Sequence, residues 1–411
     1  MGRQTFLSLT IRNYRLYFIG QAISWSGTWM QTIAQGILML QLTGSGTALG
    51  SMMALQFMPS LLFGAMAGVI TDRYSKRRLI FITQGLSGIL ALALGLLVAF
   101  HLIEVWMVYV LAFLHGCLIA LDNPARHAFV TEMVGKDLIK NAISLNSSQV
   151  NFARIAGPAL AGFIIATMGL VVCFMLNAVS YLAVLLVLFL MKKDELFLTT
   201  PAPRKSGQIR EGLRYVKSSF PLMYTLIMVS IVGTLGFEFP VILPLFAKFT
   251  FHNETAGYAA LTSAMGVGAI VGGLMAAHNK KATIQMLTLS CLFFGISMTI
   301  AAIAPSLISA ILLMLIVGVF SVNFTALATT ILQVESDPSM RGRVMSLWTV
   351  AFLGSTPIGG PIIGWIGEFF GPRWGMAIGG VSAILTALCG AYFLSKVSGE
   401  NAERKKFQLR Q

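Results

Sequence analysis

The sequence predicts an all-α integral membrane protein with twelve transmembrane helices in two pseudo-symmetric six-helix bundles. Of its 411 residues, 56% are hydrophobic and 11% are charged, and the mean hydropathy is +0.80. Soluble domains are about 45–50% apolar and about 25% charged. This chain therefore has too little charge to cover a water-facing surface, which excludes an ordinary soluble enzyme. Each span takes about 20 apolar residues, so twelve spans fit and a large soluble domain does not.

Apolar windows give the positions of the spans and divide the chain. The expected spans are 16–40, 47–70, 79–100, 104–124, 145–168 and 170–191, then 221–247, 256–278, 283–303, 306–332, 344–369 and 373–396. The expected domains are an N-terminal bundle (1–191), a cytoplasmic connector (192–220), a C-terminal bundle (221–396) and a basic cytoplasmic tail (397–411). Within the connector, Ile209, Leu213 and Val216 share one helical face, which predicts an amphipathic helix on the membrane surface.

The basic residues predict the orientation of the chain. A net charge of +14 would suggest nucleic acid in a soluble protein, but here the charges lie in short loops between apolar runs. With both termini cytoplasmic, all but three of the 29 Lys and Arg residues lie on the inner side. The exceptions are Lys248 and Arg373 outside and Arg154 within a span. Such asymmetry is what the positive-inside rule expects, and no nucleic-acid partner is expected.

Residues that would carry catalysis or bind a metal are scattered. The four cysteines lie far apart within apolar runs, and the five histidines form no metal-ligand spacing. No H-E-x-x-H, G-x-S-x-G or P-loop motif occurs. We therefore expect no enzyme, no cofactor and no metal site. A membrane-embedded enzyme is the alternative from another class, and it is disfavoured because it would need a clustered catalytic set.

The two halves of the chain share a spacing of small residues. Gly157, Gly162 and Gly169 recur about 200 residues later as Gly359, Gly364 and Gly371. In transporters such parallel duplication places the binding site between the halves.

The segment GAMAGVITDRYSKRR at 64–78 resembles the signature loop of the major facilitator superfamily, with Ser75 in place of a glycine. The resemblance implies the major facilitator fold and a cytoplasmic gate that closes in the outward-open state. An ordinary positively charged loop is the alternative, but it would need neither the acid nor the glycines. The residues expected at this gate are Gly64, Gly68, Asp72, Arg73, Arg77, Arg126 and Arg343.

A second resemblance extends over nearly the whole chain. The segments LTGSGTALG, FMPSLLFG, NPARHAF, ARIAGPALAG and SMRGRVMSLW resemble one bacterial exporter branch, which includes the enterobactin exporter and macrolide efflux proteins. It implies a monomeric, secondary-active exporter of small amphiphilic molecules, siderophore-like or drug-like, in the bacterial inner membrane. Its expected partners are the small-molecule substrate, the proton gradient and membrane lipids. An importer or a lipid transporter on the same fold remains the alternative.

Span five carries a second motif of that branch. GPALAG resembles the antiporter motif of this span, with Gly157, Pro158 and Gly162 allowing close helix packing and Arg154 preceding them. We expect Arg154 to tie span five to neighbouring carbonyls or acids. The antiporter motif of span four is degraded, because AFLHG at 112–116 has no arginine.

Two residues are candidates for proton coupling. Charges inside spans are costly and mark transport pathways, and Glu238 is the clearest acid inside an apolar run. Its alternatives are binding a cationic part of the cargo or pairing with Arg154. His115 is the second candidate because histidine titrates near neutral pH; a packing hydrogen bond is its alternative.

Polar side chains at helical spacing predict a substrate cavity. Span one carries a polar and aromatic stripe at one face, for which helix packing is the alternative. The substrate-cavity candidates are Gln21, Trp25, Thr28, Gln35, Thr234 and Asn323. Asp122 and Arg126 lie one turn apart, so a simple pair with each other is a further expectation.

Overall fold

The computed structural model describes residues 6–197, 208–278, 282–337 and 340–408, and this part of the chain is helical throughout, without strands. The N-terminal half contains α2 (Arg12–Thr43), α3 (Gly46–Arg73), α4 (Lys76–Ala99), α5 (Val105–Met168) and α6 (Leu170–Leu190), preceded by the short η1 (Leu7–Thr10). The connector contributes η2 (Lys193–Glu195) and α7 (Gln208–Ser218).

The C-terminal half contains the remaining helices. They are α8 (Phe220–Gly236), α9 (Phe239–Leu245), η3 (Phe246–Thr250), α10 (Glu254–His278), α11 (Ile284–Ala302), α12 (Leu307–Val334), α13 (Arg341–Leu353), α14 (Thr356–Phe369) and α15 (Pro372–Gln408). Among the described residues, eleven helical runs are long and apolar enough to cross a membrane. The polar stripe of α2 lowers its hydropathy below that of the others; counting this 32-residue helix gives the twelve expected spans.

Residues 125–144 correct the expected loop between spans four and five. They are helical, and α5 contains both spans with a sharp kink at Gly135, where φ is 69° and ψ is −176°. Glycine adopts this left-handed φ without a steric penalty, so two helices can meet here without a polar loop to mark the boundary in the sequence.

Spans seven and eleven are each broken, which also corrects the expected continuous helices. The first break separates α8 from α9 at Phe237 and Glu238, and the second separates α13 from α14 at Gly354 and Ser355. A proline stands in the first turn of the helix that follows each break. Proline has no N–H to continue the preceding helix but suits a first turn.

The connector helix α7 packs on the C-terminal half. Val216 is buried with Leu222, Leu332 and Val344, whereas Leu213 is 45% exposed. The side chain of Ile209 lies outside the described residues. The apolar face of α7 is therefore packed in part against α8, α12 and α13, and its other part is exposed.

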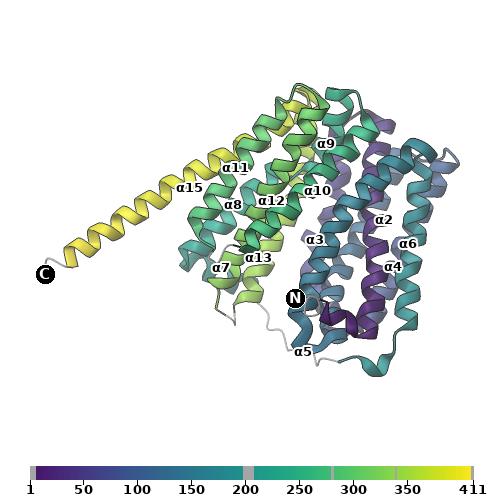
Figure 1. Ribbon diagram of the computed structural model, residues 1–411, viewed down its shortest axis with the longest axis horizontal. Helices are drawn as coiled ribbons and strands as arrows, with labels where there is room; N and C mark the ends of the chain where they lie inside the picture. The colour runs from purple at the N-terminus through teal and green to yellow at the C-terminus, as the bar shows by residue number, and fades with distance from the viewer. Residues whose placement is uncertain (1–5, 198–207, 279–281, 338–339, 409–411) are drawn as a thin grey trace.

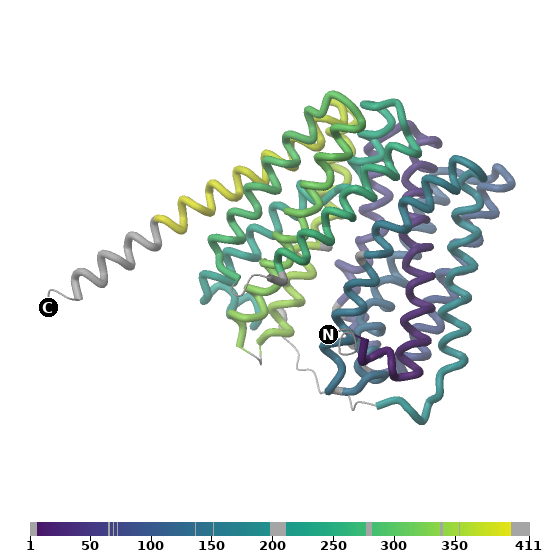
Figure 2. Tube along the Cα trace, viewed as in Figure 1, coloured from purple at the N-terminus to yellow at the C-terminus, as the bar shows by residue number. Residues whose placement is uncertain are grey.

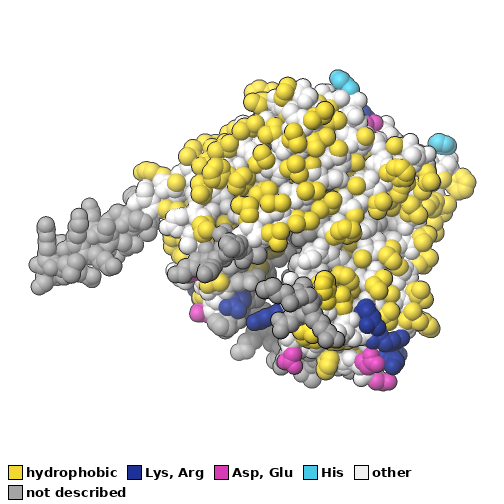
Figure 3. Space-filling model, viewed as in Figure 1, with side chains coloured by type: hydrophobic (Ala, Val, Ile, Leu, Met, Phe, Trp, Pro, Cys, Tyr) yellow, Lys and Arg dark blue, Asp and Glu magenta, His cyan; other side chains and the backbone are white. Residues whose placement is uncertain are grey.

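The two halves lean together at one end and stand apart at the other (Figure 1 and Figure 2). We call these the outer and inner ends, after the orientation that the charge distribution predicts. Lys and Arg side chains gather at the inner end, while apolar side chains cover the flanks (Figure 3). With that predicted orientation, the closed outer end and the separated inner end correspond to an inward-facing arrangement.

Glycines bring the halves into contact near the outer end. A methyl group at Gly46 would lie 2.5 Å from the carbonyl oxygen of Gly364, and one at Gly50 would overlap that of Gly360. At the second seam, a methyl group at Gly162 would lie 2.6 Å from the Cβ of Ala259. Backbones of α3 and α14, and of α5 and α10, thus approach closely because these side chains are absent.

Candidate transport site

A cavity of about 440 Å³ lies between the two halves. The N-terminal half supplies Trp29, Thr32, Ile33, Met53, Phe57 and Arg154. The C-terminal half supplies Phe237, Glu238, Phe239, Pro240, Leu243, Tyr258, Thr262, Met265, Ser321, Val322, Thr325, Ala326, Thr329, Trp348, Phe352 and Thr356. An apolar, aromatic wall with a few polar groups is the usual composition of a small-molecule site.

Glu238 is the one acid in the lining of this cavity. Its side chain is only 2% exposed, and its Oε1 atom has no hydrogen-bond partner among the described residues. The residue forms the N-cap of α9, and Thr356 and Gly359 of α14 lie beside its carboxyl group. A methyl group at Gly359 would lie 2.8 Å from Oε1. The carboxyl group therefore occupies space that is open only because residue 359 is a glycine.

The two broken spans meet at this carboxyl group. The positive ends of helix dipoles lie at helix N-termini, and both α9 and α14 begin next to Glu238. Discontinuous helices of this kind form midplane binding sites in transporters, where the half-helix N-termini favour anions. The two helix N-termini thus lower the cost of a carboxylate at this position.

Arg154 lines the opposite wall of the same cavity. Its guanidinium carbon lies 5.2 Å from the centroid of the Trp29 ring, which is a cation–π contact. Its Nε atom has no hydrogen-bond partner in the described part of the chain. Among the described residues no ion pair joins Arg154 to Glu238. Glu238 and Arg154 therefore do not neutralise each other in this conformation.

Other polar atoms around the cavity are also unpartnered among the described residues. They are the indole nitrogens of Trp29 and Trp348 and the hydroxyl oxygen of Thr262. Buried polar groups in proteins are nearly always hydrogen-bonded, so a cluster of exceptions needs an explanation. The two indole nitrogens and the Nε atom of Arg154 make three groups that can only donate hydrogen bonds. The cluster suits a ligand that brings acceptor oxygens.

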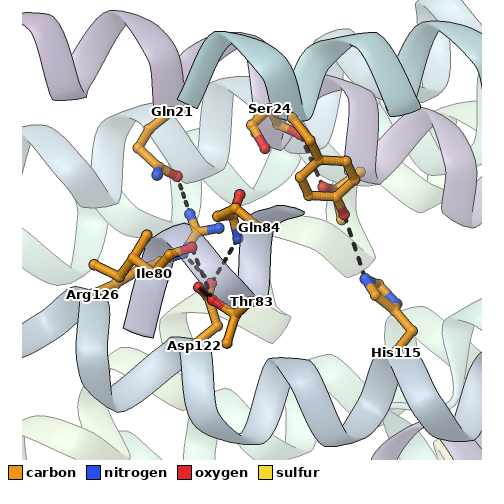
Figure 4. A network of polar contacts seen from close by, with 10 residues as sticks. Gln21, Ser24, Ile80, Thr83, Gln84, His115, Asp122 and Arg126 are labelled. Carbon is orange, nitrogen blue, oxygen red and sulfur yellow. Dashed lines mark hydrogen bonds and ion pairs between the residues drawn. The ribbon is translucent and has the colours of Figure 1, made fainter. Parts of the chain in front are cut away.

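A second polar network lies inside the N-terminal bundle (Figure 4). The carboxylate of Asp122 accepts hydrogen bonds from Thr83 at 2.6 Å and from Gln84 at 3.1 Å, and it pairs with Arg126. Arg126 also donates to the side-chain oxygen of Gln21. The expected pair of Asp122 and Arg126 is thus present, within a larger network that the sequence did not reveal.

Two candidate cavity residues belong to this network. Gln21 accepts from Arg126, and the Trp25 ring lies 5.2 Å from the Arg126 guanidinium carbon. Arg126, which was expected at the cytoplasmic gate, has these contacts inside the N-terminal bundle. The polar residues Thr83 and Gln84 in an apolar run were the available signal for this network.

His115 lies apart from the 440 Å³ cavity. Its Nδ1 atom is 3.5 Å from the Nε2 of Gln56, and its Nε2 atom is 3.4 Å from the hydroxyl of Tyr181. Both distances are long for hydrogen bonds. The histidine thus lies between Gln56 of α3 and Tyr181 of α6, outside the lining of the central cavity.

The remaining cavity candidates lie outside the cavity lining, and three of them have hydrogen-bond partners elsewhere. Thr28 donates to the Ser24 carbonyl, Thr234 donates to the Ser230 carbonyl, and Asn323 accepts from Ser290 at 2.6 Å. Gln35 is buried on α2, outside the cavity lining. The lining hydroxyls that sequence reasoning missed are Thr262, Ser321, Thr325, Thr329 and Thr356. A repeat of hydroxyl residues every four positions on α12 was the signal for three of them.

The expected gate residues lie at the inner end and make bonds within their own halves. Arg77 donates to the Leu188 carbonyl at the end of α6, and Arg343 pairs with Glu211 of α7 at 2.7 Å. Arg73 is exposed, and open space surrounds Gly64. Gly68 is half-buried on α3. The side chain of Asp72 lies outside the described residues. No hydrogen bond or ion pair joins gate residues of the two halves in the described ranges.

A second hollow, of about 540 Å³, lies between α8 and α15 and away from the seam between the halves. Its lining carries no charged side chain, and it includes Phe220, Ile227, Ile231, Leu385 and Phe393. This groove on the flank of one bundle lacks the charged and unpartnered groups of the central cavity. The candidate site is therefore the smaller, central cavity.

Two six-helix halves, broken helices around a polar cavity and one closed end define a membrane transporter. The chain belongs to the major facilitator superfamily, in the family described as transmembrane secretion effector, whose model matches residues 4–408. It is 24% identical to the staphyloferrin A transporter of Staphylococcus aureus over 93% of this chain and 96% of the relative. It is also 24% identical to the enterobactin exporter of Citrobacter koseri over 94% of each chain.

The fold is also similar to a solved structure. This is a bacterial homologue of the human lysosomal transporter Spinster in an inward-facing, occupied conformation, with a TM-score of 0.73 and 15% identity over 93% of this chain and 96% of that one. The chain is thus a multi-pass membrane transporter and not an enzyme.

Proposed function

We propose that the protein exports small amphiphilic organic molecules, siderophore-like or drug-like, in exchange for protons by alternating access. The observation that carries the proposal is Glu238, a buried acid with an unpartnered oxygen in the cavity between the halves. Low-dielectric surroundings make an uncompensated carboxylate costly. The site therefore needs a cation, which a proton supplies most simply.

The features around Glu238 support reversible proton binding. The N-termini of α9 and α14 favour the carboxylate, whereas burial among apolar side chains favours the neutral acid. A group balanced between both forms can bind a proton in one conformation and release it in the other. Binding of a cationic part of the cargo at Glu238 is the alternative.

The hydrogen-bond donors that line the cavity suggest the chemistry of the cargo. Arg154 and the indole N–H groups of Trp29 and Trp348 are donors without partners in the described chain. A cargo with an anionic, oxygen-rich group and an apolar or aromatic body would match them. The names of the two relatives give staphyloferrin A and enterobactin, both siderophores, as their cargo.

Metabolite profiling of a deletion strain under iron limitation tests the function. Relative to the complemented strain, we expect an acidic, oxygen-rich compound to accumulate in cells and to be depleted from the medium. Accumulation in the medium instead would favour an importer. A change confined to membrane lipids would favour a lipid transporter.

We also propose that both termini and residues 192–220 face the cytoplasm and that 248–256 face outward, in the bacterial inner membrane. The charge distribution motivates this orientation. After removal of native cysteines, an impermeant thiol reagent should label a cysteine at position 253 in intact cells, but not one at position 205. The opposite labelling pattern would invert the topology.

The gate proposal concerns Asp72. We expect its carboxylate to bridge the inner ends of the halves in the outward-open state by contacting the N-terminus of α13, with Arg126 of its own half as a second partner. Asp72→Asn should reduce transport severalfold while leaving folding intact. The measurement is transport in proteoliposomes, with Asp137→Asn, an exposed acid of the α5 kink region, as the control. Normal transport by Asp72→Asn would contradict the gate.

A further inference from the structure

Four charged side chains at the outer end fall into two pairs, according to whether they form hydrogen bonds within one half of the protein or across to the other half. Arg373 donates to the carbonyls of Ala302 and Ala304 at 2.9 Å, and Glu104 accepts from the Trp106 indole at 2.6 Å. Each of these bonds stays within one half of the protein. The bonds of Lys248 and Glu368 instead cross from the C-terminal half to the N-terminal half.

Lys248 binds the end of α2. Its Nζ atom donates to the carbonyl oxygen of Leu40 at 3.1 Å, and it pairs with Glu254 at 2.8 Å. The last carbonyls of a helix form the negative end of its dipole, and the Leu40 carbonyl, which also accepts from the Gly44 N–H at 2.9 Å, is one of them. A lysine from η3 of the other half therefore complements the C-terminus of α2.

Glu368 binds the start of α3. Its Oε2 atom accepts from the Ser45 hydroxyl at 2.6 Å and from the Thr47 N–H at 2.9 Å. The N-terminus of a helix offers free N–H groups and positive dipole charge. A carboxylate from the end of α14 thus complements the N-terminus of α3.

The two contacts lie on either side of one turn. α2 ends at Thr43 and α3 begins at Gly46, so the C-terminal half holds both ends of the Gly44–Ser45 turn with charges of opposite sign. Directly below it, α3 and α14 are in backbone contact at Gly46 and Gly364. The halves cannot separate at the outer end without breaking both charged contacts.

We infer that Lys248 and Glu368 form an outer latch that stabilises the inward-facing state by capping the α2–α3 turn from the opposite half. The latch must open for the cavity to face outward. It acts on the conformational equilibrium alone, and it is independent of the cargo and of proton coupling at Glu238. It is also distinct from the inner gate, which closes in the opposite state.

Distance measurements across the outer end test the latch. Leu102 and Ile303 are exposed residues in outer turns of the two halves, 61% and 71% accessible. Spin labels on cysteines at these positions, in the otherwise cysteine-free full-length protein in proteoliposomes, report the separation of the halves by double electron–electron resonance. A longer distance marks outward opening.

The expected result is a shift toward the longer distance in latch variants. Glu368→Ala and Lys248→Met should each raise the outward-to-inward ratio by about threefold, and the double variant by about tenfold. The matched controls are Glu104→Ala and Arg373→Met, which remove outer charges that bond within one half. These should leave the ratio unchanged.

Milder variants guard against loss of folding. Ser45→Ala removes one donor to Glu368, and Glu368→Gln removes the charge while retaining an acceptor. Both should shift the distribution in the same direction by less than Glu368→Ala. A double latch variant, or these milder variants, with the same distribution as the controls would overturn the latch. A variant that loses proton-driven transport while keeping the control distance distribution would concern proton coupling at Glu238 and not the latch.

Discussion

Replacing Glu238 with glutamine is expected to abolish export driven by a pH gradient in proteoliposomes. Glutamine keeps the size of the side chain but cannot bind or release a proton. The Oε1 atom of Glu238 has no hydrogen-bond partner among the described residues, so the substitution breaks no hydrogen bond at that atom. Exchange of cargo at equal pH should persist, because alternating access does not itself require the charge.

Thr325→Ala is the matched control for this experiment. Thr325 lines the same cavity and donates to backbone carbonyls of its own helix, so its loss removes no titratable group. It should retain export driven by the pH gradient. If Glu238→Gln exports at the wild-type rate under a pH gradient, Glu238 is not the coupling site, and His115 is the next residue to replace. Loss of both driven export and exchange would favour cargo binding at Glu238.

Replacing Arg154 with glutamine is expected to weaken cargo binding while leaving proton coupling intact. A hydrogen bond to a charged group contributes about 1.5–3 kcal/mol, which corresponds to a rise in the KM for an anionic cargo of at least about tenfold. The reason is the position of Arg154 on the cavity wall, with its Nε atom unpartnered and its planar group over Trp29. Export of a neutral analogue should change little.

Arg154→Lys distinguishes recognition from packing. Lysine keeps the charge but loses the planar group that stacks on an aromatic ring and binds carboxylates in two places. It should restore part of the affinity lost in Arg154→Gln. The measurement is the concentration dependence of uptake into inside-out vesicles. A decrease in the maximal rate with an unchanged KM in both variants would assign Arg154 to structure instead of recognition.

The membrane class and the approximate spans follow from local composition. A bilayer requires apolar residues over a set length and satisfied backbone hydrogen bonds, so each span is visible in its own residues. The breaks at Glu238 and Ser355 were less visible, because a proline in an apolar run is compatible with either a kink or a new helix start. The helical continuation of 125–144 through the Gly135 kink was hidden for a similar reason.

The candidate site was predictable only in part. Glu238 and Arg154 were conspicuous because charges are rare in apolar runs, and both line the central cavity. Gln21 and Trp25 share a polar stripe with Thr32, yet only Thr32 reaches that cavity, since the first two surround Arg126. Sequence periodicity gives a face of a helix but not the helix that this face meets.

The sequence by itself determined that this chain spans a membrane and belongs among major facilitator transporters, because both depend on local hydropathy and on short motifs. The one-turn spacing of Asp122 and Arg126 predicted their pair, but only tertiary structure decided what the charges of the cavity contact. Asp122 has Arg126 within its own bundle, whereas Glu238 and Arg154 share a cavity without an ion pair between them. It also decided that Lys248 and Glu368 reach across to α2 and α3. Such partners depend on helix packing between distant segments, about which local composition carries no information.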